Sequence, residues 1–292
     1  MKKFFSLFLS AILLAGMLSG CATTSSANTD QTQDKKSLHI VTTIFPEYDW
    51  VREVLGDQAD QAEITFLLDN GVDMHSYQPS AEDIMNISTC DLFIYAGGES
   101  DAWAADAVKN AANKNRQVIN LMDILGENAK EEEIVEGMQA EHDHEHEDED
   151  GGEHEEEPEY DEHVWLSLKN AQLFVSAIAD SLSNIDPTHA DTYAANASAY
   201  NGKLAQLDTD YQAAVDVAPI HTVLFADRFP FRYLVDDYGL SYYAAFSGCS
   251  ADTEASFDTI IFLANKVNEL GLHSILTIEN SNDKIANTII QN

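Results

Sequence analysis

The amino-acid sequence predicts an α/β fold of two blocks joined by one long helix. Short β-rich runs alternate with helical stretches from residue 38 onward, which is typical of parallel sheets. Between the two alternating series, apolar residues recur every three or four positions from Tyr193 to Tyr211, as on one face of a helix. Asp186 and Pro187 precede this stretch as an N-cap and a first-turn proline. We therefore expect helices over residues 169–217, including the long linking helix.

The first block is expected over residues 38–168. Four β-rich runs predict its strands at 38–43, 62–68, 91–95 and 117–121. Pro46 opens a predicted helix that reaches Leu55 and is closed by a glycine. Ser80 is expected to cap a second helix, with two acidic residues in its first turn, where negative charge is favourable.

An acidic segment at residues 131–162 interrupts this block. It holds 18 of the 51 Asp and Glu residues and almost no large apolar group after Met138. Such a segment cannot bury enough apolar surface to offset the entropy of ordering it, so we expect a disordered loop. Its four histidines are His142, His144, His146 and His154. Imidazoles among carboxylates would bind zinc weakly and exchange it quickly; the alternative is a solvated acidic linker.

The second block is expected over residues 218–292. Three β-rich runs predict strands at 221–225, 241–246 and 273–278, with helices near 229–238 and 256–270. The chain ends just as a further helix begins near residue 282. This lobe is therefore expected to be incomplete, or truncated, after three strands.

The N-terminal residues predict export. Residues 1–20 combine two lysines, an apolar run and small residues before Cys21, which is the pattern of a secretory signal peptide. The run is shorter than the ~20 apolar residues of a membrane-spanning helix. Leu-Ser-Gly before Cys21 is similar to a bacterial lipobox, so we expect a lipid on Cys21 and a flexible tether over 21–37. The protein would then be anchored to the extracytoplasmic face of the bacterial membrane; a simple signal peptide with a chance cysteine is the alternative.

The charge balance narrows the classes of partner. The chain has 15 basic and 51 acidic residues, a net charge of −36 at pH 7. Nucleic acid is excluded as a partner because phosphate binding needs a basic surface, whereas cations are favoured. Cys90 and Cys249 could pair in principle, but two cysteines make no disulfide framework. Cys90 is expected to pack as a small apolar residue.

Three metal-capable residues lie at the edges of predicted elements. His75 follows the second strand, His163 lies where the acidic segment rejoins the fold, and Glu279 ends an apolar run. In open α/β sheets, ligands bind at the carboxyl ends of strands. Imidazole and carboxylate are ligands that zinc accepts. An isolated histidine at a strand end is also a common structural feature.

Several motifs together resemble one family, the zinc- and manganese-binding solute receptors of ABC importers. The resemblance runs from about Leu38 to the end of the chain. Its motifs are Val41-Thr42-Thr43-Ile44-Phe45-Pro46, His75-x-Tyr77-x-Pro79-Ser80, Asp91-Leu92-Phe93-Ile94-Tyr95, His163-Val164-Trp165-Leu166, Tyr233-Leu234 with Tyr238-Gly239-Leu240, and Ile278-Glu279 with Lys284-Ile285-Ala286.

The resemblance implies two Rossmann-like lobes bridged by a rigid helix, with the metal in the cleft between the lobes. It places His75, His163 and Glu279 on three ligand positions of the family. A His-rich acidic loop, as in the zinc branch, matches residues 142–154. At the fourth position, where the family has a histidine, this chain has Arg228, a permanent cation that cannot bind zinc.

The resemblance leaves the fourth ligand open between Asp227, which precedes Arg228, and a water molecule. It also implies that the last strand and helix of the family are missing. Cys249 has then either lost a partner in that segment or is a buried free thiol.

The function expected from these observations is capture of Zn(II) outside the cell and its delivery to the permease of an ABC importer. We expect a monomer and no enzymatic activity. Three alternatives remain: a manganese receptor of the same family, a surface zinc buffer or adhesin not coupled to transport, and a zinc hydrolase. The hydrolase is disfavoured because no His-Glu-x-x-His motif is present.

Overall fold

The structure of the protein, a computed structural model, describes residues 37–69, 71–139, 159–250, 254–279, 281 and 283–291. Residues 37–292 form one compact unit. The expected signal peptide, lipid anchor and tether up to residue 36 lie outside the described residues, as does most of the acidic segment, including its four histidines.

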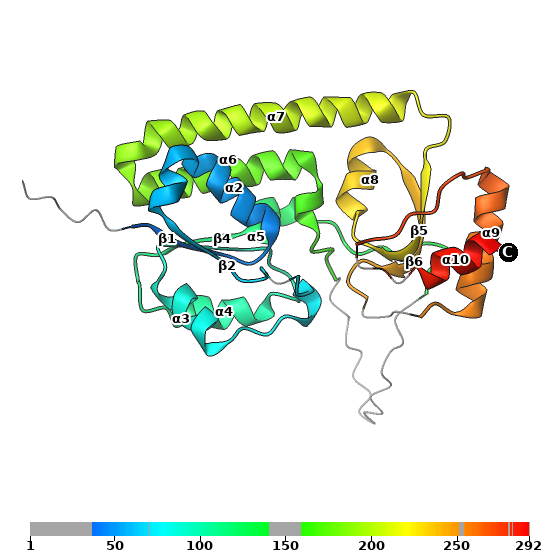
Figure 1. Cartoon of the computed structure of the whole chain (residues 1–292), viewed down its shortest axis with the longest axis horizontal. Helices are drawn as coiled ribbons and strands as arrows, with labels where there is room; N and C mark the ends of the chain where they lie inside the picture. The colour runs from blue at the N-terminus through cyan, green and yellow to red at the C-terminus, as the bar shows by residue number, and fades with distance from the viewer. Residues whose placement is uncertain are drawn as a thin grey trace, which may run out of the picture. The chain divides into compact units, whose positions relative to one another are not determined.

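The first block contains a parallel sheet of four strands in the order β2-β1-β3-β4 (Figure 1). The strands are β1 (His39–Thr42), β2 (Glu63–Phe66), β3 (Leu92–Tyr95) and β4 (Gln117–Asn120). All four predicted strands are therefore confirmed. Every residue of β3 is buried, as expected for the central strand of a sheet covered on both faces.

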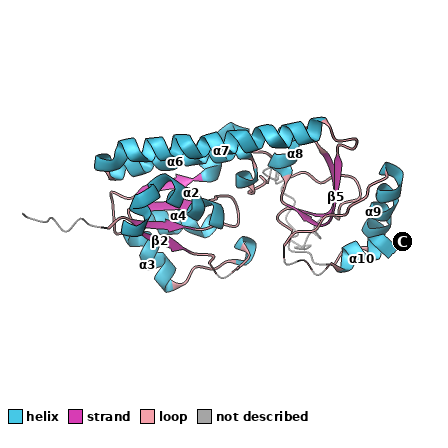
Figure 2. Cartoon of the chain, turned by 45° about the horizontal axis from the view of Figure 1, so that its top comes forward, coloured by secondary structure: helices cyan, strands magenta, loops and turns pink. Residues whose placement is uncertain are grey.

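Helices cover both faces of this sheet (Figures 1 and 2). They are α2 (Phe45–Leu55), α3 (Ala81–Thr89), α4 (Ala102–Lys109), α5 (Leu121–Leu125) and α6 (Leu168–Ile185). Alternate strand residues point to opposite faces. Ile94 packs in a core with α2 and α6, whereas Phe93 packs with Cys90 and α4. The predicted role of Cys90 as a packed apolar residue is confirmed, because the residue is fully buried.

The predicted long helix is α7 (Ala190–Asp216). It begins three residues later than expected, because Pro187–His189 form a 3-10 turn. Asp186 is not its N-cap; instead its carboxylate lies 2.6 Å from His189 Nδ1 and accepts the Tyr193 hydroxyl at 3.0 Å. Tyr193 is fully buried among α6 and the rest of the first block.

The far end of α7 contacts the second block. Tyr211 stacks on Tyr238 of α8 (Arg232–Tyr238), with ring centroids 5.6 Å apart. The Tyr238 hydroxyl donates to Asp208 of α7 at 2.9 Å. One helix therefore packs against both blocks, as the sequence predicted (Figure 1).

The second block has a parallel pair of strands, β5 (Thr222–Phe229) and β6 (Ser241–Ser247), with α8, α9 (Phe257–Leu270) and α10 (Lys284–Gln291). The predicted third strand at 273–278 is wrong: only Leu276 pairs, through a bridge to Phe225. The helix expected from residue 229 begins at Arg232, because β5 continues past a register irregularity to Phe229. Phe229 is buried and stacks on Tyr242, which keeps the strand extended.

Both ends of the acidic segment have defined structure, whereas the sequence predicted a disordered loop over all of residues 131–162. Glu131 bridges to Tyr160, and Gln139 bridges to Phe246 of β6. Met138 is buried against β5 and β6, so its apolar side chain supplies the burial that the purely acidic residues lack. The flanks of the segment therefore belong to the fold.

Glu47 of α2 is a fully buried carboxyl. It accepts the backbone N–H groups of Thr43 (2.8 Å) and Ile44 (3.2 Å). Burial, aided by the charge of Asp101, raises the pKa of Glu47 to about 8. The folded protein thus holds a proton on this group that the unfolded chain releases at an ordinary carboxyl pKa.

The free energy of unfolding of wild type should fall as the pH rises, and replacing Glu47 by Gln should make this fall smaller. Between pH 5 and 8 the unfolded wild type binds fewer protons than the folded state at this site, so the free energy of unfolding falls by up to about 1.4 kcal/mol per pH unit. Glutamine keeps the acceptor oxygen but does not titrate. Urea unfolding across this range should show a shallower decline for Glu47→Gln than for wild type. The exposed Glu82→Gln is the control, and parallel curves for Glu47→Gln and wild type would contradict the assignment.

Candidate metal centre

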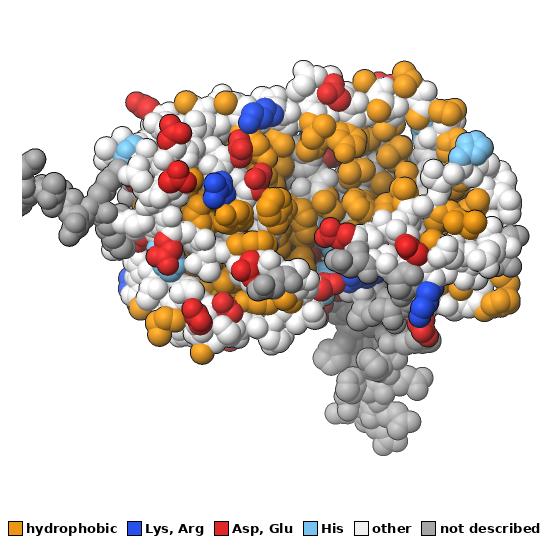
Figure 3. Space-filling model, viewed as in Figure 1, with side chains coloured by type: hydrophobic (Ala, Val, Ile, Leu, Met, Phe, Trp, Pro, Cys, Tyr) orange, Lys and Arg blue, Asp and Glu red, His pale blue; other side chains and the backbone are white. Residues whose placement is uncertain are grey.

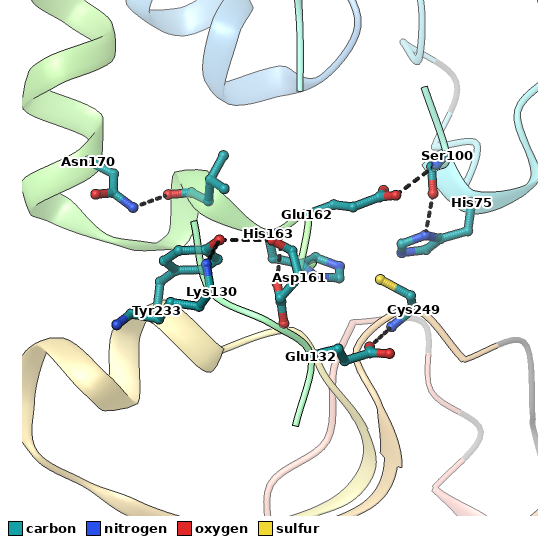
Figure 4. Close-up of polar contacts among 11 residues, drawn as sticks. His75, Ser100, Lys130, Glu132, Asp161, Glu162, His163, Asn170, Tyr233 and Cys249 are labelled. Carbon is teal, nitrogen blue, oxygen red and sulfur yellow. Dashed lines mark hydrogen bonds and ion pairs between the residues drawn. The ribbon is translucent and has the colours of Figure 1, made fainter. Parts of the chain in front are cut away.

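Three side chains from distant parts of the chain meet where the two blocks face each other (Figure 4). His75, Glu162 and Cys249 each offer one ligand atom, and these atoms lie within 4.8 Å of one another. His75 follows β2, Glu162 precedes α6, and Cys249 follows β6. The sequence predicted one of these three, His75.

His75 lies in a 3-10 turn, Met74–Ser76, between β2 and α3. Asp73 caps this turn by accepting the backbone N–H of His75 at 3.0 Å. A hydrogen bond of 2.8 Å joins His75 Nδ1 to Ser100 Oγ, which leaves Nε2 as the nitrogen for a metal. Burial, together with the neighbouring His163, lowers the pKa of His75 to about 4, so the imidazole is neutral at physiological pH.

His163 is almost fully buried beside His75, with the two ring centroids 5.3 Å apart. Its Nδ1 lies 3.0 Å from Asp161 Oδ1, which also accepts its backbone N–H at 2.8 Å. A carboxylate on Nδ1 fixes the tautomer that presents Nε2, the usual arrangement of a metal-binding histidine. His163 therefore flanks the three-residue group, although it is not a member of it.

The segment that carries His163 is held by both blocks. The Tyr233 hydroxyl of α8 donates to the carbonyl of Asp161 at 2.9 Å and accepts the N–H of Lys130 at 3.0 Å (Figure 4). Ser167 caps α6 and donates to Asp237 at 2.6 Å. These contacts fix the position of His163 relative to the second block.

Glu162 is a metal-capable residue that sequence reasoning missed, because it was assigned to the disordered loop. It is 2 % exposed. Its Oε1 accepts the N–H of Ser100 at 2.7 Å, whereas its buried Oε2 has no hydrogen-bond partner. Burial raises the pKa of this carboxyl above its usual value. In the sequence, only its place directly before His163 and an apolar run could have indicated that Glu162 lies in the site.

Cys249 is the second residue that sequence reasoning did not place in the site. Cys249 and Cys90 are both free thiols, so the pairing that the sequence left possible is not formed. The backbone N–H of Cys249 donates to Glu132 at 3.1 Å, and Figure 4 shows its sulfur directed toward the His75 ring. Burial and the nearby carboxylates raise the pKa of the Cys249 thiol.

The structure places Asp227 and Glu279 outside the three-residue group. Asp227 lies in β5, where Oδ1 accepts the N–H of Arg228 and Oδ2 is buried without a partner. Glu279 is exposed, in a turn before α10. Arg228 Nη2 donates to Asp73 Oδ2 at 2.9 Å, so this cation forms an ion pair beside the site.

The surroundings attract cations. Acidic side chains are spread over the face shown in Figure 3, where few Lys and Arg side chains are visible. With a net charge of −36, the protein generates a negative potential that concentrates cations near it, most strongly at low salt. None of the helices in the described ranges combines the length and apolar character needed to span a membrane.

Comparison with known proteins agrees with these features. The model of the family described as ZnuA, "Zinc-uptake complex component A periplasmic", matches residues 40–292. The zinc-binding lipoprotein AdcA of Streptococcus pneumoniae (strain ATCC BAA-255 / R6) is 33% identical over 280 residues, covering 96% of this chain and 52% of AdcA. The chain thus spans about half the length of the AdcA proteins it matches.

Two further relatives extend the comparison. The high-affinity zinc uptake system protein ZnuA of Bacillus subtilis (strain 168) is 30% identical over 288 residues, covering 99% of this chain and 85% of that protein. The crystal structure of the Zn(II)-bound ZnuA-like domain of S. pneumoniae AdcA is 29% identical and superposes with a TM-score of 0.65, covering 87% of this chain and 84% of that domain. The chain belongs to the ZnuA family of zinc-uptake complex components.

Proposed function

We propose that this protein is an extracytoplasmic receptor that captures Zn(II) and delivers it to the permease of an ABC importer. The observation that carries the proposal is the convergence of His75, Glu162 and Cys249 beside His163, between the two blocks. The zinc-uptake family and its zinc-binding relatives support it. We further propose that a lipid on Cys21 anchors the receptor to the membrane; the pneumococcal relative is named a lipoprotein.

The geometry suits a carrier of metal better than a zinc hydrolase. His75 and Glu162 belong to the first block and Cys249 to the second, so a bound ion ties the two blocks together. Separating the blocks would break the ligand set, which gives the receptor a physical means of releasing its cargo. The chain also contains no His-Glu-x-x-His motif of the kind that zinc hydrolases use.

The donor atoms favour zinc over manganese. Imidazole nitrogen is a ligand that zinc prefers, whereas manganese prefers sites of carboxylate, carbonyl and water oxygen. Two imidazoles lie at this site, and the lowered pKa of His75 keeps its nitrogen available without competition from protons. We therefore propose zinc as the transported ion and manganese as a weak competitor.

The first test is removal of an imidazole. His75→Ala should weaken zinc binding by at least about 100-fold, more than the 10–100-fold typical of losing a group that only orients a ligand. Affinity would be measured by competition with a chromophoric chelator. All variants would carry Asn in place of His142, His144, His146 and His154, so that the acidic segment contributes no imidazole.

The matched control is His221→Ala, which removes an exposed histidine outside the group and should leave the affinity unchanged. Equal zinc affinity for His75→Ala and His221→Ala would contradict the proposed site.

A second test crowds His163 without changing a ligand. A Cβ at Gly248 would lie 3.1 Å from His163 Cε1 and 3.0 Å from the carbonyl oxygen of Phe229. Gly248→Ala should displace the ring and reduce zinc affinity roughly 10-fold, since overpacking costs about 1–3 kcal/mol. Isothermal titration with zinc would measure the change. Gly202→Ala, where nothing lies within 4 Å of the added Cβ, is the control; similar affinities for the two variants would argue against a role for the His163 position.

Transport is tested in cells. In the native strain lacking this chain, the wild-type gene should restore growth in zinc-depleted medium, and the His75→Ala gene should not, because cargo capture precedes delivery. Adding zinc should restore growth of the strain that carries the His75→Ala gene, whereas adding manganese should not. Full rescue by His75→Ala would show that growth does not depend on this site.

A further inference from the structure

Cys249 brings a sulfur atom close to the possible ligand atoms of His75 and Glu162. The ligand atoms of His75, Glu162 and Cys249 are mutually within 4.8 Å. From bond lengths of about 2.0–2.3 Å, the ligand atoms of a tetrahedral zinc ion lie about 3.3–3.8 Å apart. A shift of about 1 Å or less per atom would therefore bring the three onto one ion. Cys249 follows β6 directly, and its N–H is held by Glu132, so the sulfur is positioned by the backbone.

A second, independent observation at the same place points to a cation. Glu162 is 98 % buried, yet its Oε2 has no hydrogen-bond partner, while Oε1 is fixed by Ser100. A buried carboxylate oxygen without a partner costs free energy unless a cation or donor compensates it. The Glu162 side chain packs closely against Gly98: a Cβ at residue 98 would lie 2.5 Å from Glu162 Cγ. The side chain is thus held in place with one oxygen left for a ligand.

Arg228 and the two predicted acidic ligands, Asp227 and Glu279, do not add a donor atom to this group. Arg228 is ion-paired with Asp73, and an arginine cannot donate a lone pair to a metal. Asp227 and Glu279, in the described part of the chain, are not among the residues whose ligand atoms converge. In addition to the nitrogen of His75 and the oxygen of Glu162, the group therefore offers the sulfur of Cys249 as a donor atom.

We propose that Cys249 is a thiolate ligand of the captured ion, acting with His75 and Glu162. The inference rests on the proposed function and deepens it by naming the cargo class: divalent cations that accept sulfur, Zn(II) and Cd(II), with Mn(II) disfavoured. When the metal–sulfur bond forms, the Cys249 S–H bond breaks and its proton passes to solvent. Cys249 is thereby a residue that determines metal specificity.

Co(II) is the probe that reports sulfur directly. The full chain, carrying Cys21→Ser in every sample, is titrated with cobalt chloride while its near-ultraviolet absorption is recorded. Wild type should develop an intense sulfur-to-cobalt charge-transfer band at one equivalent. Cys249→Ser should lose this band, and Cys90→Ala, which removes the thiol buried in the first block, should retain it. Zinc should displace the cobalt and abolish the band in wild type.

A second measurement needs no substitution at Cys249. Alkylation of each cysteine by iodoacetamide is followed by peptide mass spectrometry with and without one equivalent of zinc. Zinc should slow the alkylation of Cys249 at least 10-fold in wild type but not in His75→Ala. Tight zinc binding with no charge-transfer band and no protection of Cys249 would overturn the thiolate ligand and leave the receptor intact. No zinc binding by wild type would instead overturn the proposed function, and this inference with it.

Discussion

Burial of the short segment Asp161–His163 between the two blocks is the constraint on which the site depends. All three residues are at most 5 % exposed, although each is polar or charged. Such burial is tolerated because the groups are bonded: Asp161 to the ring and backbone of His163, its carbonyl to Tyr233, and Glu162 to the backbone of Ser100. Among these groups, the exception is Glu162 Oε2, which is buried without a hydrogen-bond partner.

The rest of the architecture serves to hold this segment against two separate turns. The four-stranded sheet places His75 and Ser100 at its carboxyl edge, after β2 and β3. The two-stranded sheet places Cys249 after β6, at the carboxyl edge of the second block. Because the strands of both sheets are parallel, their carboxyl ends gather side chains from distant parts of the sequence at one place. The helix α7 packs on both blocks and joins them outside the site.

Opposing electrostatic effects meet at this place. The large negative charge of the chain favours approach of cations in general. Burial acts the other way on His75, Glu162 and Cys249, because it favours the neutral form of each side chain. A bound divalent ion reverses these preferences for the carboxyl and the thiol. The negative charge thus attracts any cation, whereas the donor atoms decide which cation stays bound.

The sequence by itself determined the α/β class, the four strands of the first block and the long helix, and it singled out His75 and His163, whose rings the fold brings together. These follow from local signals: β-rich runs, helical periodicity, and histidines at element edges. It could not determine that 273–278 pairs through Leu276 alone, or that Met138 anchors one flank of the acidic segment, because both depend on contacts distant in sequence.

Only the tertiary structure brought Glu162 and Cys249 to His75. The spacing of 87 residues between Glu162 and Cys249 carries no signal, since their proximity arises from the meeting of two separately folded blocks. The same packing paired Arg228 with Asp73 and left Glu279 exposed. Local sequence fixes which elements form, whereas the donor set of a site between blocks is decided by how the elements pack.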